Sequence, residues 1–344
     1  MIVTKLEKIG LLGLSAWVCV SCAIPSPYPP QQKPVPVVEK KIDKSQIPPI
    51  ASIKPPVSLT PPLPPPPITP SPMIPPAVTT SSFIPAAILP ASLVSLRNQT
   101  AVPGGIAWIT LDNQSNTPPK VVYKQHQVVV LRSGKSWVAL VGIPLSAKPG
   151  THSVLEQQTG ERYSFQVKNK KYKTQRLRIK NKNKVNPNRQ ELQRIKREYK
   201  LIKAALASPW QAKKTSPLPL IQPIQGRFSS SFGLRRYFNG KPRNPHSGLD
   251  IAAPSGTPIA AAGVGKVVNT GNYFFTGNTV FIDHGQGVVT QYGHLDEIIV
   301  SSGQTVKTGQ IIGTVGKTGR ATGPHLHWGV SLNNTMIDPK LVMR

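Results

Sequence analysis

Hydrophobic positions in the second quarter of the chain come in short runs. Between residues 93 and 180 the apolar runs cover 106–109, 128–131 and 137–141, and Gly and Pro residues separate them. Runs of this length, bounded by turn residues, predict β-strands rather than helices. We therefore expect a small β-sandwich over residues 93–180.

The apolar spacing changes to a helical period after Pro187. Asn188 and Glu191 stand three residues apart, which is the spacing of a capping box at a helix start. Apolar residues then follow at helical intervals until the run ends at 208–209, and they are Leu192, Ile195, Tyr199, Ile202 and Leu206. We expect a short basic helix within residues 181–219 that packs through these apolar positions and turns a cationic face outward.

Residues 220–344 return to strand patterns that glycine punctuates. Apolar runs at 264–268, 279–282 and 310–315 alternate with Gly-containing turns, and helical spacing is scarce. This pattern predicts a compact antiparallel sheet in a barrel-like sandwich. The expected fold class is therefore mainly β.

Composition limits where folding begins. Twenty-two of the 38 prolines lie between Pro25 and Pro90. Proline donates no backbone hydrogen bond, so a segment this rich in it builds neither helix nor sheet. Residues 23–92 are expected to be a disordered stalk, which either holds the rest of the chain away from an anchoring surface or serves as a plain linker.

The first 22 residues have the features of an export signal. Lys5 and Lys8 precede an apolar run at 9–20, which is short for a permanent membrane span. Ser21 and Cys22 follow that run like the end of a bacterial lipobox, in which Cys22 would carry the lipid, although Cys19 stands where leucine is usual. Three fates stay open, namely a lipoprotein, a soluble secreted protein and an uncleaved anchor. We expect an exported protein of the periplasm or cell envelope, attached to the inner or outer membrane if the lipobox is used.

Net charge narrows the range of partners. The chain has 42 Lys and Arg against 13 Asp and Glu, a formal charge of +29, and residues 168–203 hold 15 of the basic side chains with two glutamates. Such a segment attracts polyanions. It lacks aromatic platforms and any known nucleic-acid motif, so a solvated face or contact with anionic envelope polymers is favoured over nucleic acid. With only two cysteines, both before residue 23, a disulfide framework or Cys-rich zinc site in the body of the protein is excluded.

Candidate chemistry gathers near the C-terminus. Five of the seven histidines lie between residues 246 and 327, and four of these stand in motifs that contain His246 and Asp250, His294, and the pair His325 and His327. Imidazole and carboxylate are ligands that zinc accepts, and three protein ligands with one open position are typical of a catalytic site. Residues two apart on a strand face the same way, so His325 and His327 are expected to point into one site. The remaining histidines are expected to have structural or surface roles: His126, His152 and His284.

The motifs in residues 226–339, about a third of the chain, carry a family resemblance. They are Ser231-Phe232-Gly233, His246-Ser247-Gly248-Leu249-Asp250, Gly277-Asn278, His284-Gly285-Gln286-Gly287, Tyr292-Gly293-His294-Leu295 and the run at 318–328. The region resembles the lysostaphin-type, or LytM-domain, zinc metallopeptidases that cut peptide bridges in bacterial peptidoglycan. The resemblance implies zinc as cofactor with His246, Asp250 and His327 as ligands, and His294 and His325 as the catalytic pair. It also implies a barrel-sandwich hybrid fold, and residues 142–150 resemble the Ig-like N-terminal domain that accompanies some cell-wall peptidases.

The expected function is zinc-dependent hydrolysis of peptide cross-links in peptidoglycan. His325 is expected to take a proton from the attacking water and return it to the leaving amine, while His294 orients water or stabilises the oxyanion, and these two roles can be exchanged. Three arginines can clamp substrate carboxylates or face solvent: Arg235, Arg236 and Arg320. The expected bond joins D-alanine to diaminopimelate, with Gly-Gly bridges as the alternative.

Two other functions stay open at this point. One is a catalytically silent LytM-domain protein that activates a cell-wall amidase, and the other is an adhesion module that uses the stalk and the basic helix. The presence of all five key residues favours the enzyme over both. A further hypothesis is autoinhibition by the β-rich domain at 93–180, lying over the zinc site of the peptidase domain at 220–344.

Overall fold

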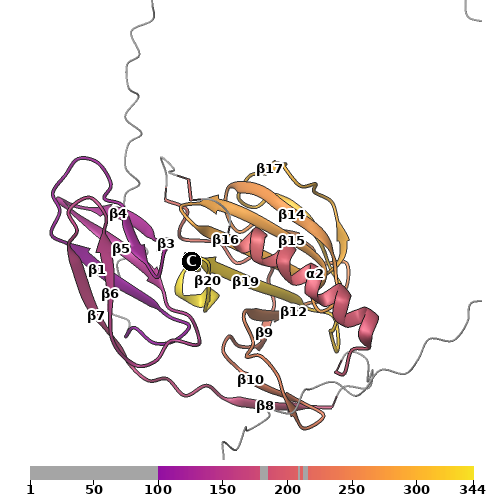
Figure 1. Cartoon of the computed structure of the whole chain (residues 1–344). Helices are drawn as coiled ribbons and strands as arrows, with labels where there is room; N and C mark the ends of the chain where they lie inside the picture. Colours follow the sequence, from indigo (N-terminus) through magenta and orange to yellow (C-terminus); the bar gives the residue numbers. More distant parts are fainter. Residues whose placement is uncertain (1–99, 179–184, 208–209, 212–215) are drawn as a thin grey trace, which may run out of the picture. The chain divides into compact units, whose positions relative to one another are not determined.

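The computed structural model describes residues 100–178, 185–207, 210–211 and 216–344 (Figure 1). The leader at 1–22, with Cys22, and the proline-rich stalk at 23–92 lie outside the described residues. In the part of the chain that is described, no helix has both the length and the apolar character needed to cross a membrane.

Two small sheets build the first folded region. One has the order β1 (Ile106–Leu111), β5 (Ser136–Gly142) and β4 (Val129–Ser133), and the other has the order β3 (His126–Gln127), β2 (Val121–Tyr123), β6 (Gly150–Glu156) and β7 (Arg162–Val167). Trp137 of the first sheet and Val154 of the second lie in one buried cluster, so the sheets share a core. The strands predicted at 106–109, 128–131 and 137–141 are confirmed, and an Ig-like relationship stays a prediction.

The C-terminal region is built on a ten-stranded sheet whose neighbouring strands pair antiparallel (Figure 1). Its main path runs β17 (Thr305–Val306), β14 (Gly265–Tyr273), β15 (Gly277–Gly285), β16 (Val288–Ile298), β19 (Leu326–Leu332), β12 (Leu249–Ala252) and β9 (Arg227–Ser230). β13 (Pro258–Ala260) pairs with β18 (Ile311–Val315), β18 also pairs with β16, and β20 (Thr335–Ile337) pairs with β19. A short 3-10 helix follows at Pro339–Leu341. The predicted mainly β fold is therefore confirmed.

Two neighbouring strand pairings bring the candidate residues together. In the register of β12 and β19, Asp250 is opposite His327, and in the register of β16 and β19, His327 is opposite Gly293. β19 thus lies between β12 and β16, and residues far apart in the sequence meet at this point of the sheet.

The two folded regions share a second core. Strand β5 is buried along nearly its whole length because its side chains alternate between two clusters. Trp137 and Ala139 face the sandwich core, whereas Val138 and Leu140 join a cluster with C-terminal residues such as Leu332. A near-continuous apolar run is what a strand covered on both faces requires.

Helix α2 (Arg189–Leu206) begins with the predicted capping box, in which the Asn188 side chain accepts from the Glu191 N–H and the Glu191 side chain accepts from the Asn188 N–H. The predicted packing face is partly wrong, since Leu192 is 45% and Tyr199 64% exposed. The buried side instead centres on Ala205, which packs against residues of β14, β15 and β16.

Polar contacts explain why α2 packs through a different face from the predicted one. Glu198 accepts the Phe274 N–H at 2.7 Å, and Arg194 donates to the Asn272 carbonyl oxygen at 3.1 Å. These two side chains therefore face the sheet, which turns Leu192 and Tyr199 toward solvent. Hydrophobic spacing alone does not report such contacts.

A short strand before α2 joins the C-terminal region. β8 (Thr174–Leu177) pairs in parallel with β10 (Arg235–Phe238), and β10 pairs with β11 (Lys241–Pro242). Tyr172, just before β8, donates to the Pro103 carbonyl oxygen and would collide with any side chain at Gly233, whose φ is +79°. These contacts of Tyr172 fix the position of the chain where β8 begins. The sequence did not predict strand β8.

Candidate active site

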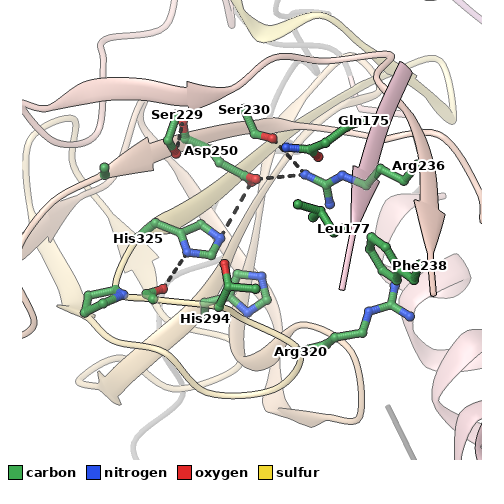
Figure 2. A pocket seen from close by; sticks show the side chains of 14 residues that line it. Gln175, Leu177, Ser229, Ser230, Arg236, Phe238, Asp250, His294, Arg320 and His325 are labelled. Atoms are coloured by element: carbon green, nitrogen blue, oxygen red, sulfur yellow. Dashed lines mark hydrogen bonds and ion pairs between the residues drawn. The ribbon is translucent and has the colours of Figure 1, made fainter. Parts of the chain in front are cut away.

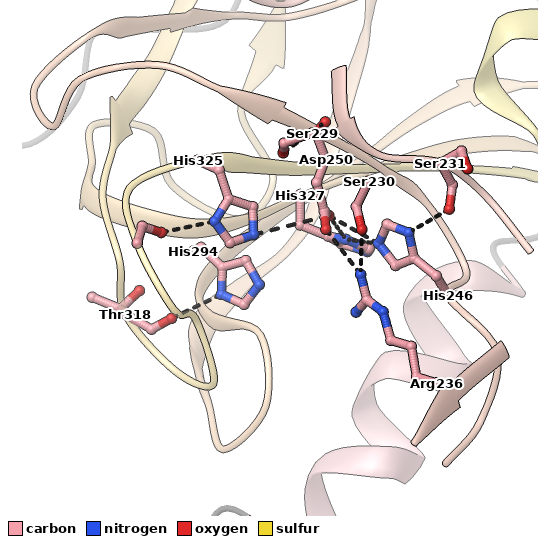
Figure 3. A network of polar contacts seen from close by, with 11 residues as sticks. Ser229, Ser230, Ser231, Arg236, His246, Asp250, His294, Thr318, His325 and His327 are labelled. Atoms are coloured by element: carbon pink, nitrogen blue, oxygen red, sulfur yellow. Dashed lines mark hydrogen bonds and ion pairs between the residues drawn. The ribbon is translucent and has the colours of Figure 1, made fainter. Parts of the chain in front are cut away.

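Three side chains form a tight triangle of ligand atoms on β12, β19 and the turn before β12 (Figure 3). His246 Nε2 lies 3.0 Å from His327 Nδ1, and both lie 2.9 Å from Asp250 Oδ1. All three residues are buried. Their ligand atoms lie within 4.8 Å of one another, which is the arrangement of a metal-binding cluster.

The triangle fits a small divalent cation. Ligand atoms bound about 2.1 Å from a tetrahedral zinc lie about 3.4 Å apart, a few tenths of an ångström more than the 2.9–3.0 Å found here. His246 Nδ1 donates to the Ser231 carbonyl oxygen at 2.9 Å, so the lone pair of Nε2 points into the triangle. Two imidazoles and one carboxylate are a donor set that zinc accepts.

Asp250 is held as a carboxylate by its neighbours. Burial alone would raise the pKa of the Asp250 carboxyl, but hydrogen bonds with His246 and His327 and the charges of these rings hold the pKa well below its usual range. Arg236 donates to Asp250 Oδ2 at 3.0 Å and to Ser230 Oγ at 3.0 Å. One carboxylate oxygen therefore faces the histidines and the other faces Arg236.

Two further histidines face the same site (Figure 3). His294 Nδ1 donates to the Thr318 carbonyl oxygen and His325 Nδ1 donates to the Gly323 carbonyl oxygen, both at 2.8 Å. A carbonyl oxygen only accepts, so each Nδ1 carries the hydrogen and each neutral ring keeps an acceptor at Nε2. The ring centroids lie 4.7 Å apart, and His325 Nε2 is 3.9 Å from Asp250 Oδ1.

His294 occupies an unusual backbone position. Its φ is +65°, in the left-handed region, and its N–H donates to the Thr276 carbonyl oxygen at 2.7 Å. Strain of this kind persists where the surroundings impose it, and it is frequent at functional sites. Burial, with His327 and His325 close by, lowers the pKa of His294 to about 3, so the ring is neutral at neutral pH.

The loop that carries Thr318, Arg320 and His325 is held by two glycines. A Cβ at Gly319, where φ is +73°, would lie 2.3 Å from the Gly277 nitrogen, and a Cβ at Gly277 would meet Thr318. Only glycine fits this approach of two backbones. The Arg320 N–H then donates to the Phe275 carbonyl oxygen at 2.8 Å, which fixes the direction of the loop.

Two cavities flank the histidines. The larger, of about 250 Å³, is lined by Asp250, His294 and His325, with Gln175 and Leu177 of β8 on its wall (Figure 2). The other, of about 190 Å³, is lined by residues that include His246 and His327. Four residues line both cavities: Arg236, Phe238, His294 and Arg320.

The structure brings all five predicted site residues into this one cluster, although β19 begins at Leu326 and His325 lies just before it. The three candidate arginines have different surroundings. Arg235 is exposed, Arg236 holds Asp250 and Arg320 lines both cavities. No sequence pattern pointed to Gln175 and Leu177, because a short charged segment does not reveal its pairing with a distant strand.

The remaining histidines lie apart from the cluster. His284 is buried, with Nδ1 2.9 Å from the Val264 carbonyl oxygen and Nε2 2.8 Å from Thr290 Oγ1, so the predicted hydrogen-bonding role is confirmed. His152 lies 2.7 Å from the Tyr123 hydroxyl.

Comparisons with known proteins follow the same division of the chain. Residues 244–339 match the model of peptidase family M23, and residues 99–170 match the model of the peptidase family M23 N-terminal domain. A crystal structure from Pseudomonas aeruginosa described as a peptidase M23 is 40% identical, with a TM-score of 0.61, and the match covers 73% of this chain and 98% of that one.

Curated relatives match over a shorter stretch. The peptidoglycan DD-endopeptidase ShyA of Vibrio cholerae is 50% identical over 103 residues, which are 30% of this chain and 24% of ShyA. The DD-carboxypeptidase/endopeptidase Mpg of Neisseria meningitidis is 41% identical over 116 residues, which are 34% of this chain and 27% of Mpg. The chain thus spans about a quarter of the length of these relatives.

Proposed function

Because this chain belongs to peptidase family M23, we propose that it is a zinc-dependent endopeptidase that hydrolyses peptide cross-links of peptidoglycan in the cell envelope. The observation that carries the proposal is the triangle of His246, Asp250 and His327 with two more histidines facing it. The named activity of the DD-endopeptidase relatives supports the D-alanyl to diaminopimelate cross-link as the substrate.

His246, Asp250 and His327 would hold the zinc. When bound, zinc polarises the scissile carbonyl and lowers the pKa of water to about 7. The hydrogen bond from His246 to the Ser231 carbonyl oxygen orients one ligand, and Arg236 orients another through Asp250 Oδ2. Such supporting contacts set the direction and basicity of the ligands.

His325 acts as the general base. Its Nδ1–H is committed to the Gly323 carbonyl oxygen, so Nε2 is the acceptor that faces the site. It takes a proton from the attacking water, and it returns that proton to the nitrogen of the leaving amine as the C–N bond breaks. Its side chain is 15% exposed, which lets the ring exchange protons with solvent.

His294 orients the attacking water. Because its Nδ1–H is donated to the Thr318 carbonyl oxygen and its ring is neutral, Nε2 accepts a hydrogen bond and cannot donate one. Of the two roles expected from the sequence, the water-orienting role fits this tautomer, and stabilisation of an oxyanion does not. The water therefore lies between two acceptors, His294 and His325.

The alternative function is a catalytically silent activator of an amidase. It is disfavoured by the presence of all five side chains with their ligand and acceptor atoms turned to one point. A silent activator would bind a partner enzyme and leave sacculi intact on its own.

The decisive experiment is incubation of the purified chain with intact sacculi, with and without a chelator. Mass spectrometry of the soluble fragments should show cross-linked dimers converted to monomers, with a new carboxyl on D-alanine and a new amine on diaminopimelate. Chelation should abolish the conversion and added zinc should restore it. Unchanged sacculi with zinc-loaded protein would refute the proposal.

The rest of the chain is assigned by the same proposal. Residues 1–22 act as the export signal, with a lipid on Cys22 if the lipobox is used, and residues 23–92 form the stalk. Residues 93–180 form an Ig-like domain, 181–219 the basic helix and linker, and 220–344 the peptidase domain. Labelling of cells with a clickable fatty acid, compared between the chain and Cys22→Ala, tests the lipid anchor.

A further inference from the structure

Arg320 is fixed in place beside the catalytic histidines. Its guanidinium carbon lies 4.2 Å from the ring centroid of Phe275 and 4.9 Å from that of Phe238. Aromatic rings attract the faces of a guanidinium and leave its N–H groups in the plane. With the backbone N–H of Arg320 held by the Phe275 carbonyl oxygen, the residue presents a planar fork of donors whose orientation is set before substrate binds.

The walls of the two cavities carry an excess of positive charge. Of the described residues that line them, three are arginines and one, Asp250, is acidic. Arg236 is engaged with Asp250, and Arg243 donates to the carbonyl oxygens of Pro242 and Val185. Burial, together with Arg236 and Arg243, lowers the pKa of Arg320 to about 10, which still leaves it protonated at neutral pH. The walls therefore favour an anionic occupant.

We propose that Arg320 binds the substrate carboxylate that stands on the carbon next to the scissile nitrogen. The inference rests on the proposed function, because in a D-alanyl to diaminopimelate cross-link the residue that donates the amine carries a free carboxylate at that carbon. A planar guanidinium matches a carboxylate with two parallel hydrogen bonds. Arg320 lines both cavities together with His294, so a carboxylate held there lies beside the bond to be cut (Figure 2).

Arg320 is thereby a specificity residue. It selects cross-links with a free carboxylate at this position over the same cross-link as a carboxamide, and over Gly-Gly bridges, whose scissile nitrogen is followed by an uncharged amide. A site built to bind a charged group rejects an analogue that lacks it, because the ionic hydrogen bonds to that group are not made.

The test compares two cross-linked muropeptide dimers that differ only in this group. The zinc-loaded chain should cleave the carboxylate dimer with a kcat/KM about 10- to 100-fold above that for the carboxamide dimer, the range of an ionic hydrogen bond. Arg320→Gln should cleave both dimers at the rate that the unsubstituted chain shows with the carboxamide. Arg320→Lys, which keeps the charge but loses the fork, should lie between them.

Arg235→Gln is the matched control, since Arg235 is exposed on β10 and lines neither cavity, and it should keep full selectivity. Equal kcat/KM for the two dimers in the unsubstituted chain would overturn the inference. An Arg320→Gln variant that loses the same factor on both dimers would also overturn it, because that is the effect of a structural residue.

Failure of the proposed function is seen separately. If neither dimer is cleaved, the endopeptidase proposal fails. Calorimetric titration of the same two dimers then still tests whether Arg320 binds the carboxylate. The unsubstituted chain should bind the carboxylate dimer with the lower Kd, and Arg320→Gln should bind both equally. Equal Kd values in the unsubstituted chain would reject the role of Arg320.

Discussion

At the scale of single residues, the guanidinium of Arg236 controls how Asp250 is presented. It occupies Oδ2 at 3.0 Å and leaves Oδ1 toward the two histidines. It also brings a positive charge next to a group that would hold a cation. The contact therefore fixes the carboxylate geometrically while drawing some of its charge away from the metal.

We expect Arg236→Gln to weaken zinc binding, because Asp250 loses the contact that orients it. Loss of such a supporting contact costs about 10- to 100-fold in metal affinity. Competition with a chromophoric chelator measures the change in Kd. The neighbouring Arg235→Gln, on the exposed side of β10, should bind zinc as the unsubstituted chain does. An unchanged Kd in Arg236→Gln would show that Asp250 is held by its histidines alone.

The roles of His325 and His327 should separate in zinc content and turnover. His325→Ala should retain zinc and lose about 100- to 10,000-fold in turnover, the usual contribution of a general base. His327→Ala should lose the metal itself. Elemental analysis and muropeptide turnover on the same preparations give both quantities. A zinc-free His325→Ala would make His325 a ligand and refute the assignment.

Short-range spacing explains why these residues were predictable. His325 and His327 stand two residues apart, the spacing that puts strand side chains on one face, and His246 and Asp250 belong to one short motif, so local sequence groups them. The role of Arg236 was not predictable, since an arginine near a carboxylate motif suggests substrate binding equally well. Only the position of its side chain against Oδ2 decides between the two.

At the scale of elements, β8 forms part of the wall of the larger cavity. Its side chains alternate, so that Gln175 and Leu177 line the cavity while Thr174 is exposed. The strand comes from the segment that follows the sandwich. The autoinhibition hypothesis is therefore best tested on this strand.

The double substitution Gln175→Ala with Leu177→Ala should raise the rate of sacculus cleavage severalfold, because it widens the cavity while leaving the backbone pairing with β10 in place. Dye release from labelled sacculi measures the rate. Thr174→Ala, on the outward side of the same strand, should have no effect. A lower rate in the double variant would instead make β8 a part of the substrate-binding surface.

Helix α2 carries a cationic face that the packing leaves exposed. Lys196, Lys200 and Lys203 are exposed on it, and Glu198 is engaged with Phe274. Replacing the three lysines with glutamine should weaken binding to purified sacculi at low salt and leave little difference at high salt, because exposed charges are screened. Co-sedimentation measures the bound fraction.

An equal change of net charge elsewhere is the control for α2. Lys120, Lys135 and Lys307 are exposed outside the helix, and their replacement with glutamine should leave binding nearly unchanged. Equal losses in both triple variants would assign the attraction to overall charge rather than to this face. The exposed Leu192 and Tyr199 show why the face had to be found in the structure, since their spacing predicted burial.

At the scale of the whole molecule, one apolar cluster joins residues from both folded regions. Ile106, Leu131 and Leu140 share it with Leu220 and Leu332. Asn333 adds two hydrogen bonds to the backbone of Gly142, at 2.7 and 3.2 Å. From the sequence, an apolar face used in this way looks the same as one buried inside its own sandwich, so the association was not predictable.

Residues 100–344 should therefore unfold in a single thermal transition, with equal calorimetric and van't Hoff enthalpies. Leu140→Ala, which removes buried side-chain atoms from the shared cluster, should lower the stability of the whole unit by about 2–5 kcal/mol. Scanning calorimetry of the unsubstituted residues 100–344 and of the Leu140→Ala variant measures both quantities. Two resolved transitions would show that the regions unfold independently.

The shared cluster also constrains the order of events during synthesis. Strands that carry Leu131 and Leu140 leave the ribosome well before Leu332, which shares their cluster. Domains whose contacts are complete can fold while the chain grows. Here the early sandwich keeps one apolar face uncovered until the strand that carries Leu332 has left the ribosome, so this cluster is completed late in synthesis.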